Sequence, residues 1–370
     1  MNTNTNKNYW HTIVIGGGQA GLATGYHLKK MNIDFLILDA DAQTGDSWRR
    51  RWNSLRLFTP AWNNGMPGHP FPGDQHSFPT KDEAADFLLE YKKKFDLPVL
   101  YNTRVMMAKK STHGFQIKLK DRTLETQNLV ITTGNYTIPK IPAFAKELHS
   151  DISQLHSSEY KSPDNLPEGK ILVVGAGTSG FQIALDLLHE KRRVYIAGKP
   201  TPQIPDFIFK YFGRQFVWVN KYILNTSTPM GRKFQAAIMQ GKGAPLIHIS
   251  PEAAQKAGVK ILQRLKGVQD GWPVTENGEK MEVSAIVWCT GFHPDYSWMD
   301  LPGAIAANGY PAANRGVSSI YPGLYFVGSS FQYSLTSTWI GGVGRDAAYV
   351  VNHLHANRKS NELKLEKSFA

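Results

Sequence analysis

TIVIGGGQAG, at residues 12–21, joins a short run of β-branched apolar residues directly to a glycine-rich turn. Such a run is typical of a strand buried in a parallel sheet. Residues 19–31 then predict a helix, and residues 35–38 predict a second strand that ends at Asp39, 23 residues after Gly16. The glycines permit a tight turn and a close approach of the backbone to a pyrophosphate, and the helix N-terminus offers unpaired N–H donors to that anion. The order of strand, turn, helix, strand and acid therefore predicts a dinucleotide-binding unit.

A second copy of this pattern begins at Gly175. Residues 171–174 predict a strand, the turn Gly175-Ala176-Gly177-Thr178-Ser179-Gly180 follows, and a helix to about His189 precedes a strand at residues 194–197. A lone GxGxxG is weak evidence, because it also occurs in kinase glycine loops and as plain turn chemistry. Two strand-bounded copies argue against that explanation and predict an α/β protein with two Rossmann-like dinucleotide-binding domains.

The two copies differ where a nucleotide ribose is recognised. Asp39 offers a carboxylate to ribose hydroxyls, so the first copy is predicted to bind FAD. The second copy has Gly198 and then Lys199 at the corresponding place, which removes repulsion of a 2′-phosphate and adds a cation. A unit charge pair at about 4 Å and an effective dielectric near 20 is worth roughly 4 kcal/mol before desolvation. The second copy therefore predicts NADPH, with NADH left open, and an exposed loop lysine is the alternative interpretation of Lys199.

Composition excludes several classes of protein. The chain has 370 residues with 41% apolar content, enough for two to three domains that each close a core. No apolar run approaches the roughly 18–20 residues that span a bilayer, and the polar N-terminus lacks a secretory signal, so the predicted location is cytoplasmic. The single Cys289 cannot form an internal disulfide, a Cys-rich zinc site or a dithiol relay. No HExxH motif occurs, and no metal site is predicted.

The net charge of +12 comes from short, separate basic clusters. The chain carries no basic arm and no RNA-binding signature, so a nucleic-acid partner is not expected. Solvated faces and attraction for anionic cofactors explain the charge better. A small-molecule substrate is the expected partner, and a homodimer is left open.

A strand predicted at residues 127–133 ends in Thr133-Gly134, and a second strand at residues 285–292 contains the matching Thr290-Gly291. Pro139 and Pro142 suit a linker that leaves one domain. Residues 1–160 and 291–370 are therefore predicted to form a discontinuous FAD-binding domain. Residues 165–290 are predicted to form an inserted NADPH-binding domain, with a helical insertion around 200–250.

Two further segments carry predictions. Residues 200–251 are rich in aromatic residues, including Phe207, Tyr211, Phe216 and Trp218, and packing within an insertion is preferred over a membrane-facing helix or a substrate lid because the apolar spacing is irregular. Residues 340–355 predict a helix whose N-terminal dipole would stabilise a reduced flavin by about 0.3–2 kcal/mol. Close helix packing explains its glycines equally well.

The assembled motifs resemble the class B flavoprotein monooxygenases, which comprise the flavin-containing monooxygenases, the YUCCA-like plant enzymes and, more distantly, the Baeyer–Villiger enzymes. Besides both glycine turns, the resemblance covers four segments: Gly45-Asp46-Ser47-Trp48, Ser54-Leu55-Arg56-Leu57-Phe58-Thr59-Pro60, His156-Ser157-Ser158-Glu159-Tyr160-Lys161 and Thr290-Gly291-Phe292. It departs at Ser150 and Ile152, where the family's identifying sequence has Phe and Gly, and at Phe58, where many members place an Asn near the flavin. The resemblance implies a two-domain flavoprotein of the glutathione-reductase-like type.

The motifs and the resemblance together nominate the site residues. The predicted FAD site comprises Gly16, Gly18, Gln19, Ala20, Gly21, Asp39, Trp48, Leu57, Val105, Thr133, Gly134, Gly328, Gln332 and Leu335. The predicted NADPH site comprises Gly175, Gly177, Thr178, Ser179, Gly180, Lys199, Thr290 and Gly291. The candidate catalytic residues are Phe58, Asn63 and Gln332, and Asn64, Tyr333 and Trp339 are further candidates for the substrate cavity, each also explained as a turn or core residue.

The resemblance implies that NADPH reduces FAD, that O2 forms a flavin C4a-hydroperoxide, and that one oxygen atom passes to a small substrate by N-, S- or Baeyer–Villiger-type oxidation. Phe58 cannot donate the hydrogen bond that an Asn would, which implies a shorter-lived intermediate or one held mainly by NADP+. Two alternatives remain. One is an NAD(P)H-dependent flavin reductase or oxidase that passes electrons to quinone or O2, and the other is a non-catalytic redox-sensing protein that binds nucleotide.

Overall fold

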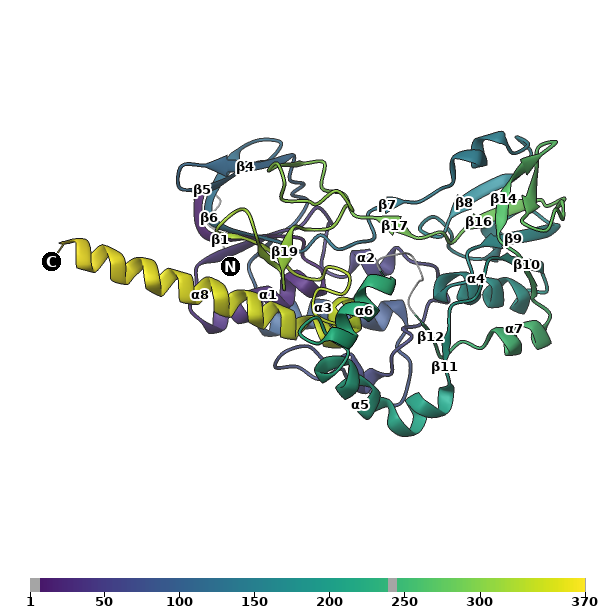
Figure 1. Ribbon diagram of the computed structural model, residues 1–370, viewed down its shortest axis with the longest axis horizontal. Helices are drawn as coiled ribbons and strands as arrows, with labels where there is room; N and C mark the ends of the chain where they lie inside the picture. The colour runs from purple at the N-terminus through teal and green to yellow at the C-terminus, as the bar shows by residue number, and fades with distance from the viewer. Residues whose placement is uncertain (1–6, 239–244, 370) are drawn as a thin grey trace.

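The computed structural model describes residues 7–238 and 245–369. Figure 1 shows two sheets side by side, joined by a narrow connection, with a helical segment below the junction. Within the described residues, no helix is both long enough and apolar enough to cross a bilayer. The two sheets are built separately around the two glycine turns.

The first sheet contains ten of the described strands. β18, β4, β5, β6, β1, β2 and β3 lie in that order, and β21 joins the edge of β6 with β20 and β19 beyond it. β3, β2, β1, β6 and β21 run parallel to one another, and β18 runs parallel to β4. β5 is antiparallel to both β4 and β6, and β20 is antiparallel to both β19 and β21. The bounds are β1 Tyr9–Ile15, β2 Phe35–Leu38, β3 Val99–Leu100, β4 Met107–Ser111, β5 Gly114–Lys118, β6 Thr123–Ile131, β18 Met299–Asp300, β19 Ala313–Asn314, β20 Val317–Ser318 and β21 Leu324–Phe326.

Helices cover one face of this sheet. Val14 packs against the helices, while its neighbours Ile13 and Ile15 pack into a second core on the opposite face, as the alternation of side chains along a strand requires. Because both faces are buried, β1 is apolar without a break. The helical segments are α1 Gln19–Lys30, α2 Asp46–Arg49, α3 Lys81–Lys94, α8 Ile340–Phe369, and the short 3-10 turns η1 Ala61–Asn63 and η5 Leu335–Thr338.

The second sheet is parallel throughout and has the strand order β13, β10, β9, β16, β8. α4 and α7 pack beside it, and Val173, Ile196 and Val287 contribute to its core. The bounds are β8 Ser153–His156, β9 Lys170–Val174, β10 Arg193–Ala197, β13 Lys260–Leu262, β16 Ala285–Trp288, α4 Thr178–His189, α7 Pro251–Ala257, the hairpin β14 Leu265–Gln269 and β15 Trp272–Thr275, and the turns η2 Ala143–Glu147 and η3 Pro163–Asn165.

The connection between the sheets is a pair of short antiparallel strands, β7 Ile138–Pro139 and β17 Phe292–His293. The chain leaves the first sheet through β7 and returns through β17 (Figure 1). The predicted fold class is therefore confirmed. The domain division stays a proposal, and the pairing of β8 with β16 favours a boundary before Ser153 instead of after Tyr160.

Residues 203–238 and 245–247 form the helical segment below the junction, with α5 Asp206–Tyr222, α6 Pro229–Ala237 and the short parallel pair β11 Gln203–Ile204 and β12 Leu246–Ile247. The preferred interpretation of its aromatic residues as packing is wrong for several of them. Phe216 is partly buried, but Phe207, Tyr211, Phe212 and Trp218 are more than half exposed to solvent. Within the described residues, none of these four side chains belongs to a hydrophobic core cluster.

The helix that the sequence predicts at residues 340–355 extends to Phe369 and projects beyond the first sheet (Figure 1). Its glycines serve packing. A Cβ at Gly341 would overlap the backbone oxygen of Asn63, and a Cβ at Gly342 would overlap that of Thr336. Only glycine lets the helix approach these two turns so closely.

Candidate nucleotide and flavin sites

Three glycines of the first turn have different structural roles. Gly16 has a φ of +109° and lies against the Thr132 backbone, so it makes the tight turn. A Cβ at Gly21 would overlap the Gly16 carbonyl oxygen, so this glycine lets α1 pack closely. A Cβ at Gly18 would meet no atom within 4 Å. The space over Gly18, at the N-terminus of α1, is open to a pyrophosphate, which is the arrangement that a dinucleotide requires.

Asp39 lies beside this turn. Ile15 is in register with Leu38, so the residues after both strands are neighbours, and a Cβ at Gly17 would overlap Asp39 Oδ2. Burial raises the pKa of the Asp39 carboxyl, and N–H donors of Asp41 and Gly17 oppose the rise. The Asp41 N–H donates to Asp39 Oδ1 over 3.1 Å. The carboxylate therefore lies directly against the first glycine turn, and its predicted contact with ribose hydroxyls stays a prediction.

The second glycine turn repeats the first. Gly175 has a φ of +115° and lies against the Cys289 backbone, and a Cβ at Gly180 would overlap the Gly175 oxygen. A Cβ at Gly177, which caps α4, would meet nothing within 4 Å. Thr178 and Ser179 form the first turn of α4. Each turn therefore leaves one open approach to a helix N-terminus.

Gly198 occupies the place that Asp39 takes in the first turn. Ala197 is in register with Val174, and a Cβ at Gly198 would lie 2.9 Å from the Ala176 backbone nitrogen. Lys199 follows with an exposed side chain. The two edges thus differ in charge, since a buried carboxylate lies beside the first turn and a solvated cation beside the second.

Three strand ends bring the remaining FAD candidates to the first turn. Ile131 is in register with both Ile15 and Phe326, so Thr133-Gly134 and Gly328 follow at the same edge as Gly16. A Cβ at Gly328 would lie 3.0 Å from the Ala20 Cβ. Gln19 Nε2 donates to the Thr338 oxygen over 3.4 Å, which joins η5 to the start of α1. The structure therefore brings Gly16–Gly21, Asp39, Thr133, Gly134 and Gly328 to one edge of the first sheet, whereas Leu335 packs with Phe331 and Trp339.

The side-chain amide of Gln332 hydrogen bonds to backbone groups. Its Oε1 accepts from the Gly328 N–H over 3.1 Å, and its Nε2 donates to the Arg315 oxygen over 3.2 Å. These bonds hold the Gly328 turn, where φ is +88°. The side chain is buried, so its contacts favour a positioning role over direct contact with substrate.

Unpaired polar atoms surround this edge. Thr133 Oγ1 and Asn135 Oδ1 are buried and make no hydrogen bond within the described residues. A small cavity is lined by Thr133, Gly134, Asn135, Tyr296, Gly328 and neighbouring residues. Since buried polar groups nearly always have a partner, these atoms fit a polar ligand such as a flavin.

Sequence reasoning missed Asn135 and Tyr296. Asn135 Nδ2 donates to the Gly328 oxygen over 3.1 Å, and burial raises the pKa of Tyr296 to about 12. Tyr296 therefore lines the cavity as a neutral phenol at physiological pH. The position of Asn135 directly after Thr133-Gly134 was a usable signal, whereas no local pattern marks Tyr296.

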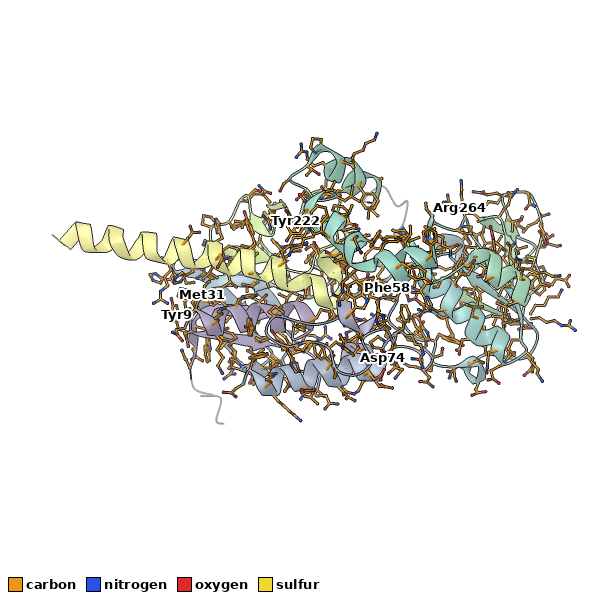
Figure 2. The ribbon with its side chains drawn as sticks, turned by 90° about the horizontal axis from the view of Figure 1, so that it is seen from below. Tyr9, Met31, Phe58, Asp74, Tyr222 and Arg264 are labelled. Atoms are coloured by element: carbon orange, nitrogen blue, oxygen red, sulfur yellow. The ribbon has the colours of Figure 1, made fainter. Side chains whose placement is uncertain are left out.

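The candidate catalytic residues fall in different surroundings. Phe58 packs edge-to-face on Trp339 with 5.6 Å between ring centroids, in an apolar cluster with Phe331 and Leu335. Figure 2 labels Phe58. Asn63 ends η1 with its amide nitrogen unpaired. Asn64, in contrast, bonds to Thr59 and Pro60 within its own turn, which identifies it as a turn residue.

The other candidates are parts of packed cores or stacks. Leu57 lies in the core beneath α1, Val105 lies in the core on the opposite face of the sheet, and Trp48 packs against the cores of both sheets. Tyr333 is stacked between the guanidinium groups of Arg315 and Arg345 at 4.0 and 4.5 Å. Their predicted contacts with cofactor or substrate stay predictions.

His156 ties the second sheet to the connection. The Ser158 N–H donates to His156 Nδ1 over 3.2 Å, so Nε2 carries the proton and donates to the Gly291 oxygen over 3.0 Å. Desolvation lowers the pKa of this fully buried imidazole. Thr290 Oγ1 donates to the Lys140 oxygen on the neighbouring segment. The motif at residues 156–161 thus orders the Thr290-Gly291 turn, where φ at Gly291 is +86°.

The motif also reaches the segment that follows Trp48. Lys161 Nζ donates to the Arg50 oxygen, and the Asn53 N–H donates to the Lys161 oxygen over 2.8 Å. Gln182 on α4 donates to the Arg56 oxygen over 3.0 Å. The segment around Phe58 is therefore anchored to the second sheet.

Cys289 lies at the end of β16, against the Gly175 turn. Burial raises the pKa of its thiol, so it is held as a neutral thiol. It is the only cysteine in the sequence. Within residues 7–238 and 245–369, no group of three or more His, Cys, Asp or Glu side chains is arranged to hold a metal ion.

Known proteins share this sequence and fold. Residues 13–206 match the pyridine nucleotide-disulphide oxidoreductase family. A Geobacillus kaustophilus protein named uncharacterized oxidoreductase CzcO-like is 37% identical over 92% of this chain and 97% of its own length. The probable indole-3-pyruvate monooxygenase YUCCA8 of Arabidopsis thaliana is 26% identical over 92% of this chain and 88% of its own length. A flavin-containing monooxygenase from Stenotrophomonas maltophilia shares the fold with a TM-score of 0.78 at 24% identity, over 95% of this chain and 99% of that one.

Proposed function

The chain belongs to the pyridine nucleotide-disulphide oxidoreductase family, and we propose that it is an FAD-dependent monooxygenase that uses NADPH to insert one oxygen atom from O2 into a small organic substrate. Its resemblance to the class B flavoprotein monooxygenases is confirmed by the relatives and by the fold that they share.

One observation carries the proposal. Each of the two turns leaves a glycine open to a pyrophosphate, but the ribose position is a buried carboxylate in the first turn and Gly198-Lys199 in the second. A carboxylate suits the ribose hydroxyls of FAD, while a lysine suits the 2′-phosphate of NADPH. A single chain with two such different turns is suited to electron transfer between two different dinucleotides.

The thiol chemistry in the family's description does not fit this chain. Disulphide reduction by a dithiol needs two cysteines, and this sequence has one. Cys289 lies against the second glycine turn and not at the edge of the first sheet, where FAD is proposed to bind. Burial raises the pKa of its thiol. Because the thiolate is the reactive form, Cys289 is poorly suited to attack a disulfide.

When bound, FAD would supply hydride acceptance and O2 activation, which no amino-acid side chain provides. The residues of this chain bind, orient and shield. Gly16–Gly21 and Asp39 would hold the FAD dinucleotide, and Gly175–Gly180 with Lys199 would hold NADPH. Gln332 holds the Gly328 turn through two backbone hydrogen bonds. Phe58, Leu335 and Trp339 form an apolar wall that would exclude water from a reactive centre.

A flavin reductase or oxidase is the second candidate, and Phe58 is the observation that favours it. The Phe58 ring is held against Trp339, and it cannot donate the hydrogen bond that an amide would supply at this position. A site without that donor is suited to electron transfer, with O2 leaving as H2O2.

The test follows the fate of oxygen. Purified protein with bound FAD is given NADPH and 18O2 with a thioether, a tertiary amine or a ketone, and product and H2O2 are both measured. We expect 18O in the product of at least one substrate class. A matched Gly177→Val variant should retain flavin but lose NADPH oxidation, because the added side chain fills the open approach over the second turn.

Two other results would each support a different function. NADPH oxidation that yields only stoichiometric H2O2 with all three substrate classes would reject the monooxygenase in favour of the oxidase. A bound flavin that NADPH does not reduce would reject both enzymes in favour of a nucleotide-binding protein.

A further inference from the structure

The segment that contains α5 and α6 has an unusual outer surface. Phe207, Tyr211, Phe212, Trp218 and Tyr222 of α5 are between 51% and 66% exposed, and Met230 of α6 is 61% exposed. We call these six residues the aromatic face. Exposed apolar side chains are common singly, but six large ones on two consecutive helices indicate a surface that binds something.

The helix geometry gathers these side chains. α5 bends at Phe212, where φ is −127° and ψ is 17°. Phe207 and Tyr211 are four residues apart before the bend, and Trp218 and Tyr222 are four apart after it, so each pair lies on one face. The Trp218 and Tyr222 rings are 5.4 Å apart between centroids. Figure 2 places Tyr222 on the helical segment at the edge of the molecule.

The opposite side of the same helices is firmly packed. Phe216 and Val217 of α5 and Phe234 of α6 pack against Phe331, Leu335 and Trp339. Gln235 Nε2 donates to the Phe331 oxygen over 3.0 Å. The aromatic residues of this segment therefore divide into a buried set and an exposed set, and the exposed set is presented on a fixed support.

Apart from Asp206, which begins α5 next to Phe207, the charged residues of this segment have one sign. Between residues 207 and 251 the sequence holds six Lys or Arg and no Asp or Glu. Four of these cations, Arg214, Lys221, Arg232 and Lys233, are described and exposed on α5 and α6. Lys221 Nζ lies 5.0 Å from the centroid of the Tyr222 ring, so cations and aromatic rings are interleaved.

We propose that the aromatic face docks on an anionic lipid bilayer. Tryptophan and tyrosine are suited to the headgroup region because their rings are apolar at one end and polar at the other. Lysine and arginine around them complement anionic headgroups. A second copy of the chain fits less well, since a two-fold symmetric contact would bring the same four cations against themselves.

Docking in this orientation has a consequence that rests on the proposed function. The inner side of α5 and α6 packs against the cluster of Phe58, Leu335 and Trp339. The predicted oxygenation site would then lie one helix layer from the lipid, where apolar substrates concentrate. The docking itself is independent of catalysis, so its test uses no turnover.

The test measures sedimentation of the full-length protein with vesicles of phosphatidylcholine alone or doped with phosphatidylglycerol. We expect binding to the doped vesicles at low salt, and about tenfold weaker binding to phosphatidylcholine or at high salt. Arg232→Ala with Lys233→Ala should weaken binding by about tenfold or more, since each cation near an anionic surface contributes roughly fivefold. Trp218→Ser with Tyr222→Ser should weaken binding to a similar extent.

Matched control variants remove the same kinds of side chain, exposed cations and an exposed aromatic ring, from the first sheet. Lys118→Ala with Lys120→Ala deletes two exposed cations on and after β5, and Tyr9→Ser deletes an exposed aromatic residue on β1. Both should bind vesicles like the unmodified protein, and circular dichroism checks that every variant folds. Absence of binding to the doped vesicles, or equal loss in the controls, would overturn the proposal. A free dimer that Trp218→Ser with Tyr222→Ser dissociates, with vesicle binding unchanged, would assign the face to a second copy.

Discussion

Asp39 after the first turn's partner strand, and Gly198-Lys199 after the second's, could adapt one backbone turn to two different nucleotides. Both follow a parallel strand that lies beside the strand leading into the glycine turn, and both turns have the same open glycine. In the proposed function, the backbone would recognise what the two dinucleotides share, the pyrophosphate. The side chain at the ribose distinguishes them, because a carboxylate repels the 2′-phosphate that a lysine attracts.

Lys199→Glu should reverse the preference of the second turn. We expect the ratio of kcat/KM for NADPH to that for NADH to fall by about tenfold or more at low ionic strength, since a repulsive charge replaces an attractive one. The loss should shrink as salt is added. Steady-state NADPH and NADH oxidation measures it.

Lys266→Glu is the control, because it makes the same charge change at an exposed position of β14. An unchanged ratio in Lys199→Glu, or an equal fall in both variants, would remove Lys199 from the nucleotide site.

The glycine turn and its helix work as one element in which each glycine has a separate task. Gly21 and Gly180 let their helices approach the strand that precedes them, while Gly18 and Gly177 face open space. These tasks differ in what they stabilise. The packing glycines stabilise the protein without any ligand, whereas the open glycines matter only when a nucleotide is bound.

Substitution by alanine should separate the two tasks. Gly18 has a φ of −74°, which alanine adopts freely, so Gly18→Ala should leave the apoprotein as stable or raise its unfolding free energy by about 0.4–1 kcal/mol. Its FAD affinity should fall by roughly tenfold or more, because one lost hydrogen bond to a charged group costs about 1.5–3 kcal/mol. Gly21→Ala should instead lower the unfolding free energy by about 1–3 kcal/mol through overpacking.

Urea unfolding and flavin titration measure both effects. Gly177→Ala is the matched control in the second turn, where φ at residue 177 is −96°. It should raise the KM for NADPH and leave flavin content unchanged. If Gly18→Ala binds FAD normally, the space over the first turn is not the pyrophosphate site.

Across the molecule, the two sheets are joined by a few specific contacts. His156 donates to the Gly291 oxygen, Lys161 to the Arg50 oxygen, and Gln182 to the Arg56 oxygen. These bonds place the second turn relative to the segment that contains Phe58. The buried neutral imidazole makes this junction sensitive to acid.

Stability should fall as the pH falls below about 7, because the unfolded chain protonates His156 near its ordinary pKa of about 6.5 while the folded chain binds that proton only at lower pH. His156→Asn should reduce the slope of unfolding free energy against pH by at most about 1.4 kcal/mol per pH unit. His27 has a pKa that burial also lowers, so part of the slope should remain. Urea midpoints across this pH range measure it.

His189→Asn is the control, since His189 is exposed at the end of α4. Its slope should match that of the unmodified protein. An unaltered slope in His156→Asn would mean that this histidine is not held neutral at the junction.

Both nucleotide turns could be predicted from the sequence because each is local. Strand, turn, helix and the following acid or lysine lie within about 30 residues, and backbone preferences over that length suffice to form them. The same holds for the fold class, which follows from two such units in one chain. The predicted helix at residues 19–31 differs from α1 by one residue at its end.

The assembly of the FAD edge depended on the tertiary structure. Thr133, Gly134 and Gly328 lie together only because β6 and β21 run in register beside β1, and no spacing within the chain specifies that register. Tyr296 and the contact of His156 with Gly291 join residues more than a hundred positions apart. Likewise Phe216 and Trp218 are both aromatic residues of one helix, but only the packing of α5 decided which is covered. Local pattern determines which backbone a segment adopts, whereas burial depends on the distant segments that pack against it.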